Sequence, residues 1–265
     1  MNWRERQAAA AATLRECREA LAARGSTIIR EVTSAGATDI VDWRHYPYGE
    51  VYDPVSHAQY FYHRHSGPAC KSPAQAIEHG HFHLFLRGEG MPAGIAPLLA
   101  PELAVANAPV PRQSAPLKLG SSDEVCHLVA LAVDGRGEPL RLFTTNRWVT
   151  GETWYRADDV IRMLDRFRVR GGRSSALLNR WIGALVRLYQ TEIAGLLRER
   201  DQAIVEQRWR WRGNVLEDPR LEITSSLDID LDARLAAIIA SAELAAAATL
   251  GRSRRLPRMA DGWGD

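Results

Sequence analysis

Residues 78–83 read Glu-His-Gly-His-Phe-His and residues 62–65 read Tyr-His-Arg-His, so two segments place histidine at every second position. In a β-strand, residues i and i+2 lie on the same face about 6.5–7 Å apart. We therefore predict two neighbouring antiparallel strands whose imidazoles project from one layer. Gly80, between His79 and His81, would let a backbone or a planar ligand approach the opposite face.

The residues around these segments predict an α+β fold. Residues 38–85 contain short extended pieces rich in Tyr, Phe, Val and His that are punctuated by Pro and Gly. Val125–Val133 and Pro139–Thr145 flank a turn rich in Gly and Asp and predict a β-hairpin. Helical periodicity predicts helices at residues 3–24, 156–167, 174–205 and 231–250. We expect a mainly antiparallel sheet that carries the histidines and is covered by C-terminal helices.

The composition is that of an average globular chain. The 265 residues are 46% hydrophobic and 25% charged, which excludes wholesale disorder, a collagen-like repeat and a disulfide-stapled miniprotein. This length suits one large domain, so we predict a single domain over residues 1–265. Its parts would be an N-terminal helix region, a histidine-rich β region, a helical region and a tail, at residues 1–37, 38–155, 156–250 and 251–265.

Charge and cysteine content bear on partners and compartment. The formal net charge of +2 is too small to make nucleic acid the expected partner. Trp209 and Trp211 alternate with arginines, which favours a second hairpin over residues 207–226 and not a base-stacking surface. No apolar run approaches the ~20 residues that cross a bilayer, and the three cysteines form no CxxC pair. We expect a cytoplasmic protein that acts on a small molecule, with no membrane partner and with homo-oligomerisation left open.

The distribution of histidine points to one site. All eight histidines lie between positions 45 and 127, and the last 138 residues contain none. Imidazole binds iron, zinc, copper or nickel, so we expect a transition-metal cofactor, with iron or haem favoured and zinc as the alternative. The candidate metal ligands are His79, His81, His83 and His127. Because one ion takes only three or four protein ligands, His63 and His65 are candidates for a wider cofactor-binding role.

Two charged residues near these segments are candidates for a direct role in catalysis. Glu78 abuts the triple-histidine run and would serve as a carboxylate ligand or as general base for metal-bound water. Arg147 lies in the polar loop at residues 144–152, and its fork of donors suits a substrate carboxylate or a haem propionate. The alternative for Arg147 is a rigid polar loop that caps a helix.

Together these residues favour a metal- or haem-dependent oxidoreductase that acts on a small molecule through a histidine-rich site. One alternative is a metal-dependent hydrolase, and another is a non-catalytic metal-binding protein. Colour and metal content separate the three. A Soret band indicates haem, a colourless zinc-loaded protein favours hydrolysis, and the absence of bound metal favours a non-catalytic protein.

Four stretches carry a resemblance to known proteins: His45–Pro47, Gln59–His65, Glu78–His83 and Phe143–Glu152. Over roughly residues 40–205 the chain resembles an uncharacterised bacterial family defined by a domain of unknown function. It is more weakly similar to haem-dependent peroxygenases that hydroxylate 3-methyltyrosine. Those enzymes use two axial histidines and a cysteine thioether, so the resemblance places haem among the metal options. The position that would supply the cysteine after His127 is Leu131.

Overall fold

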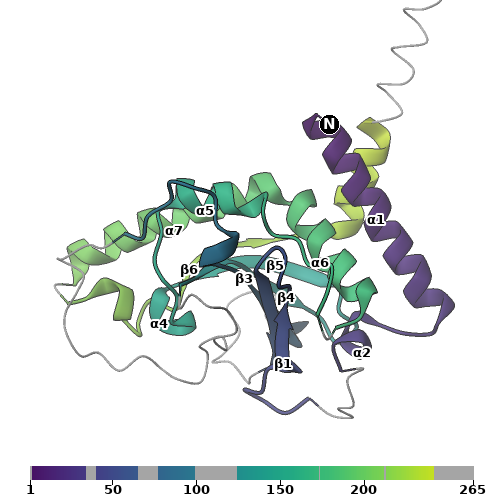
Figure 1. Ribbon diagram of the computed structural model, residues 1–265, viewed down its shortest axis with the longest axis horizontal. Coiled ribbons are helices and arrows are strands. Elements are labelled where there is room, and N and C mark those ends of the chain that lie inside the picture. Colours follow the sequence, from purple (N-terminus) through teal and green to yellow (C-terminus); the bar gives the residue numbers. More distant parts are fainter. Residues whose placement is uncertain are drawn as a thin grey trace, which may run out of the picture.

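The computed structural model describes residues 2–33, 40–64, 77–98, 124–172, 174–211 and 213–241. A six-stranded antiparallel sheet, in which each strand pairs with the next one along the chain, lies at its centre (Figure 1). The strands, in order across the sheet, are β1 (Tyr46–Tyr52), β2 (Ala58–His63), β3 (Gly80–Arg87), β4 (Val125–Val133), β5 (Pro139–Thr145) and β6 (Ile223–Asp228). The predicted α+β fold with an antiparallel, histidine-bearing sheet is confirmed.

Helices cover one face of this sheet, and α5, α6 and α7 lie along it in Figure 1. The helix α7 packs on β5 and β6, α5 packs on β4, and α1 packs on α6. The helical elements are α1 (Trp3–Ala23), α2 (Ile28–Thr33), α4 (Arg147–Thr150), α5 (Ala157–Leu164), α6 (Ala176–Leu188) and α7 (Gln190–Arg210), with 3₁₀ turns η1 (Gly88–Gly90) and η2 (Val215–Glu217). Residues 231–241 are also helical. Within the described ranges, no helix has both the length and the apolar character needed to cross a bilayer.

Strand alternation gives the sheet two different faces. Phe82 of β3 points to the helices and contacts Trp181 of α6, with ring centroids 5.9 Å apart. His81 and His83 flank Phe82 in β3 and therefore belong to the opposite face, together with His63 of β2. All residues of β2, β3 and β4 are buried. The histidines are thus buried polar groups that require internal partners.

Several local elements follow the sequence pattern closely. The helix α1 spans all but the last residue of the predicted range 3–24, and it begins with a capping box between Asn2 and Glu5. The strands β4 and β5 coincide with the two halves of the predicted hairpin. The turn chemistry and the apolar alternation therefore suffice to locate these elements.

Two predictions are wrong. The single helix expected over residues 174–205 is divided at Tyr189, whose φ of −106° and ψ of 20° lie outside the helical region. The hairpin expected over 207–226 does not form in the described residues of that range, where α7 continues to Arg210 and Ile223–Asp228 is the one strand. Extending an existing helix adds hydrogen bonds without a new nucleation step. This gain outweighs the strand preference of a five-residue segment in which Trp and Arg alternate.

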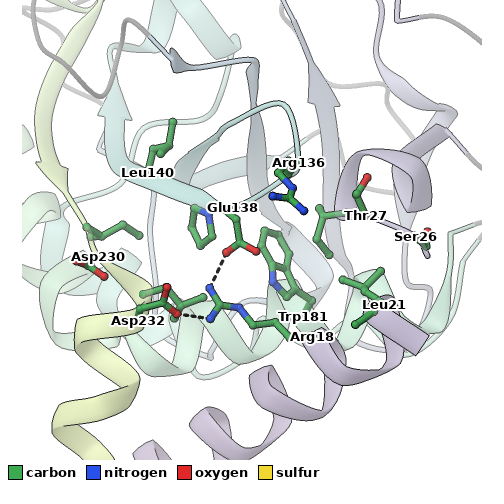
Figure 2. A pocket seen from close by; sticks show the side chains of 15 residues that line it. Arg18, Leu21, Ser26, Thr27, Arg136, Glu138, Leu140, Trp181, Asp230 and Asp232 are labelled. Atoms are coloured by element: carbon green, nitrogen blue, oxygen red, sulfur yellow. Dashed lines mark hydrogen bonds and ion pairs between the residues drawn. The ribbon is translucent and has the colours of Figure 1, made fainter. Parts of the chain in front are cut away.

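A pocket of about 680 Å³ lies between α1, the turn after β4 and residues 229–232 (Figure 2). Arg18 crosses it and pairs with Asp232 and, at 2.6 Å, with Glu138. None of the residues that line this pocket is a histidine. The pocket is therefore separate from the histidine-bearing face.

Asp53 fastens the β1–β2 turn to the segment before α6. Its Oδ1 accepts the backbone N–H groups of Val55 and Ser56 at 2.9 and 3.0 Å, and its Oδ2 accepts those of Arg170 and Gly171 at 2.6 and 3.0 Å. Burial opposes ionisation, but these four hydrogen bonds lower the pKa of Asp53 to about 2. The carboxylate therefore holds two segments that are far apart in the sequence.

We predict that Asp53→Asn lowers the free energy of unfolding by about 1–2 kcal/mol at pH 7, because the amide keeps only one acceptor oxygen. Since the folded-state pKa lies below that of the unfolded chain, this contribution is present above pH 4 and is lost as the pH falls towards 2. Urea unfolding at pH 7 and at pH 2.5 measures it. The exposed Asp158→Asn is the control, and equal stability of the two variants would contradict the role of Asp53.

Candidate metal centre

Three buried imidazoles meet on the sheet face that is turned away from the helices. His63 of β2 lies directly opposite His81 of β3, and His83 is the next β3 residue on that face. One nitrogen from each ring lies within 4.8 Å of the other two. The exposed fractions of the three residues are 2%, 6% and 1%, respectively. We call His63, His81 and His83 the histidine triad.

Glu78 orients one member of the triad. Its Oε1 accepts the Nδ1 hydrogen of His81 at 2.8 Å, and its Oε2 accepts from Arg141 at 2.8 Å. Burial alone would raise the pKa of Glu78, but these hydrogen bonds lower it. The other nitrogen of His81, Nε2, lies 2.7 Å from Nε2 of His63. A carboxylate behind an imidazole fixes the tautomer that exposes the lone pair on the opposite nitrogen, as in many metal sites.

His127 of β4 supports the triad through His83. Its Nε2 lies 3.1 Å from Nδ1 of His83. Burial, followed by the charges of neighbouring histidines, holds the pKa of His83 well below its usual range. Burial and the nearby Arg200 lower the pKa of His127 to about 3. Both rings are neutral at pH 7 and keep a lone pair for a hydrogen bond or a metal.

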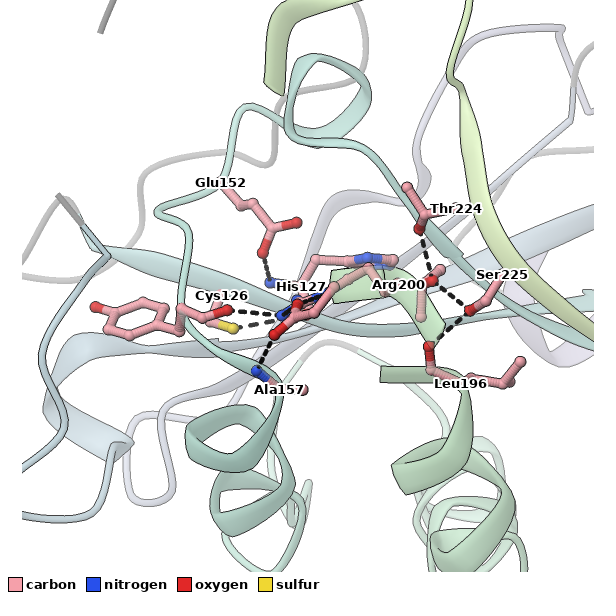
Figure 3. A network of polar contacts seen from close by, with 11 residues as sticks. Cys126, His127, Glu152, Ala157, Leu196, Arg200, Thr224 and Ser225 are labelled. Atoms are coloured by element: carbon pink, nitrogen blue, oxygen red, sulfur yellow. Dashed lines mark hydrogen bonds and ion pairs between the residues drawn. The ribbon is translucent and has the colours of Figure 1, made fainter. Parts of the chain in front are cut away.

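The motif at residues 143–152 positions His127. A β-bulge at Leu128 shifts the register between β3 and β4, so that His127 shares the face of the triad. The backbone N–H of His127 donates to Oε2 of Glu152 at 2.7 Å (Figure 3). The Thr145 hydroxyl lies 3.4 Å from Nδ1 of His127. The motif therefore holds His127 from both its backbone and its ring.

Aromatic rings surround the imidazoles. Phe61 lies beside His83, and Phe143 lies edge-on to His81, with ring centroids 5.3 Å apart in each pair. Trp43, which is 49% exposed, lies edge-on to His63, with ring centroids 6.3 Å apart. An apolar wall of this kind lowers the local dielectric and strengthens electrostatic interactions at the nitrogens.

The structure brings together four of the six histidines that the sequence singled out, namely the triad and His127. His79 is placed apart from them, since its Nδ1 lies 2.6 Å from the Tyr62 hydroxyl and the two rings stack with centroids 6.3 Å apart. Because β3 begins at Gly80, His79 is not held to the strand alternation. The space that a Gly80 side chain would fill is taken by the Tyr62 side chain and by the backbone oxygen of His63, so a backbone approaches this glycine as expected. His65 lies outside the described residues.

The two charged candidates have defined partners. Arg147 begins α4 after the cap residue Asn146 and forms an ion pair with Glu217. Among the described contacts, none joins Arg147 to the triad. Glu78 reaches the triad through the ring of His81, and both of its oxygens are engaged. Arg147 is thus the first residue of a short helix that Asn146 caps, and Glu78 orients a histidine.

A row of polar side chains beside the triad was not predicted from the sequence. His45 lies 2.8 Å from Glu50, Gln59 also donates to Glu50, and Arg87 donates to Gln59 at 2.8 Å. Gln59 and Arg87 share the strand parity of the triad, so the period of two could have found them. Glu50 lies in an interruption of the β1–β2 register, where no periodic signal exists.

A family profile described as Domain of unknown function (DUF6969) matches residues 8–229. The chain belongs to this family. The DUF6969 region contains all six strands and the whole histidine triad. No curated protein and no solved structure is significantly similar to the chain. The expected membership of a domain-of-unknown-function family is confirmed.

We predict that Glu152 makes the stability of this DUF6969 protein depend on pH. Burial raises the pKa of Glu152 to about 7, so the folded protein holds a proton that the unfolded chain releases near pH 4.5. The bound proton therefore adds about 3 kcal/mol to the free energy of unfolding below pH 4.5, and this contribution is lost as the pH rises through 7.

The variant Glu152→Gln keeps an acceptor for His127 and removes this titration. The stability difference, wild type minus variant, should fall between pH 4.5 and pH 7.5 in chemical denaturation. Parallel curves for the two proteins would contradict the raised pKa of Glu152.

Proposed function

We propose that this protein is a metal-dependent oxidoreductase that acts on a small molecule at an ion held by His63, His81 and His83. The observation that carries the proposal is the convergence of three buried imidazole nitrogens within 4.8 Å. A transition-metal ion satisfies all three nitrogens at once.

The donor set fits an ion. The Nε2 atoms of His63 and His81 lie 2.7 Å apart, which is a hydrogen-bond distance with one proton between them. Two nitrogens bound to one tetrahedral ion stand about 3.3 Å apart, so a small side-chain rotation and the loss of that proton make room for it. Glu78 and His127 already hold the outer nitrogens of His81 and His83. Such outer partners raise the affinity of imidazole for a metal.

Close packing of the rings favours a single ion over haem. Haem takes four nitrogens from its own porphyrin and only axial ligands from the protein, so it has no use for three convergent imidazoles. The rings of His63, His81 and His83 stand only 4.5–5.1 Å apart, centroid to centroid. We propose iron, with zinc as the alternative. Bound iron would supply electron transfer to or from the substrate.

The position of Glu78 favours redox chemistry over hydrolysis. A hydrolase of the kind considered from the sequence needs a free carboxylate as general base for water. Both Glu78 oxygens are already engaged, by His81 and by Arg141. The role of Glu78 is therefore to orient His81.

Location in the cytoplasm is part of the same proposal. Cys17 and Cys126, the cysteines within the described ranges, are free and buried. A reducing compartment keeps thiols in this form. Iron in its ferrous state is likewise maintained by a reducing compartment.

We predict that His63→Ala, His81→Ala and His83→Ala each lower metal content at least tenfold, since each removes one of three ligands. The measurement is elemental analysis after removal of metal with a chelator and reconstitution with ferrous iron or zinc. His79→Gln is the matched control, because His79 belongs to the same sequence motif but bonds to Tyr62.

Equal metal content in all four variants would contradict the assignment of the triad. An absorption spectrum of the protein as isolated tests the cofactor separately. A Soret band would replace the single ion by haem, and zinc bound at full occupancy in place of iron would favour the hydrolase.

A further inference from the structure

His45 lies beside the triad without belonging to it. Its ring stacks on Phe61 with centroids 3.7 Å apart and meets His63 edge-on with centroids 5.6 Å apart. Phe61 in turn lies against His83. The imidazole of His45 therefore borders the proposed metal centre.

Hydrogen bonds fix which nitrogen of the His45 ring carries the proton when the ring holds only one. Its Nδ1 lies 2.8 Å from Oε1 of Glu50, and the other Glu50 oxygen accepts from Nε2 of Gln59. Arg87 donates to the carbonyl oxygen of Gln59 at 2.8 Å, so Gln59 must turn its amino group towards Glu50. A carboxylate only accepts hydrogen bonds, so Nδ1 of His45 is the donor and Nε2 keeps its lone pair.

The chain takes up an unfavourable backbone conformation to build this pair. Glu50 has a φ of +56°, and Gly49 before it has a φ of +81°. The register between β1 and β2 is interrupted between Tyr46 and Val51, which lets Glu50 reach inward. Glu50 is only 2% exposed. Strain of this kind in a buried residue is typical of functional sites.

The proposal depends on the second ring nitrogen of His45, the one that does not face Glu50. Nε2 of His45 is buried and has no hydrogen-bond partner within the part of the chain that the structure describes. A buried acceptor without a partner is unfavourable, and it is satisfied when a ligand supplies the missing donor.

We propose that Nε2 of His45 accepts a hydrogen bond from the substrate and so selects small molecules that carry an N–H or O–H group next to the atom that binds the metal. This inference rests on the metal centre of the proposed function. Glu50 is a positioning residue, because it acts through His45 by fixing the tautomer.

Acetohydroxamate is a suitable probe because it binds metals through two oxygens and leaves its N–H free. N-methylacetohydroxamate binds metals in the same way but lacks that donor. Both are titrated into cobalt-loaded protein at pH 8.5, and binding is followed by the visible spectrum of cobalt. The ratio of the two dissociation constants, N-methylacetohydroxamate over acetohydroxamate, should be about tenfold larger for wild type than for Glu50→Gln or His45→Phe.

Glu50→Gln reverses the tautomer without removing a ring. The new amide must accept from Gln59, so its amino group donates to Nδ1 of His45 and moves the proton to Nε2. The preference for the N–H probe should disappear in Glu50→Gln and in His45→Phe, and it should persist in the distant control Glu138→Gln. A preference that survives in Glu50→Gln would overturn the proposal, because it would then be steric.

The tautomer can also be measured in the wild-type protein without any metal or probe. The ¹⁵N chemical shifts of His45 should show a protonated Nδ1 and an unprotonated Nε2, and the reverse would overturn the proposal even if both variants fail to fold. Absence of cobalt binding by wild type would overturn the metal centre and this inference with it. Cobalt binding with equal preference in all variants would overturn this inference alone.

Discussion

The pairing of β2 with β3 is the constraint on which the site depends. Its register sets His63 against His81, and the two-residue period of the strand adds His83. A slip of one residue would turn the histidines of one strand to the helix face and bring Phe82 out of its contact with Trp181. The apolar packing on one face therefore fixes the position of the imidazoles on the other.

Burial of so many polar groups is tolerated because the groups supply one another with partners. Glu78 joins His81 to Arg141, and Glu50 joins His45 to Gln59 and, through it, to Arg87. Burial also holds the pKa of His83 and His127 below their usual range, so these rings are neutral and need no counter-charge. The result is a rigid set of lone pairs in an apolar setting, which suits a transition metal.

Much of this arrangement could be predicted from the sequence, because strand alternation is a local property. The period of two indicated the face shared by His81 and His83, and the turn chemistry located β4 and β5. His79 shows the limit, since it precedes the first residue of β3 and turns towards Tyr62. The pairing of His45 with Glu50 was beyond prediction, because a register interruption and tertiary contacts bring the two residues together. The break at Tyr189 between α6 and α7 likewise has no Gly or Pro to mark it.

The central claim is that three imidazoles from two adjacent strands bind one ion. X-ray absorption spectroscopy of the metal-loaded protein tests it most directly, because it reports the number and type of atoms around the metal. With zinc as the loaded metal, three imidazole nitrogens are expected at about 2.0–2.1 Å in the wild type and two in His63→Ala. A sulfur ligand, or a shell with fewer than three imidazoles in the wild type, would contradict it.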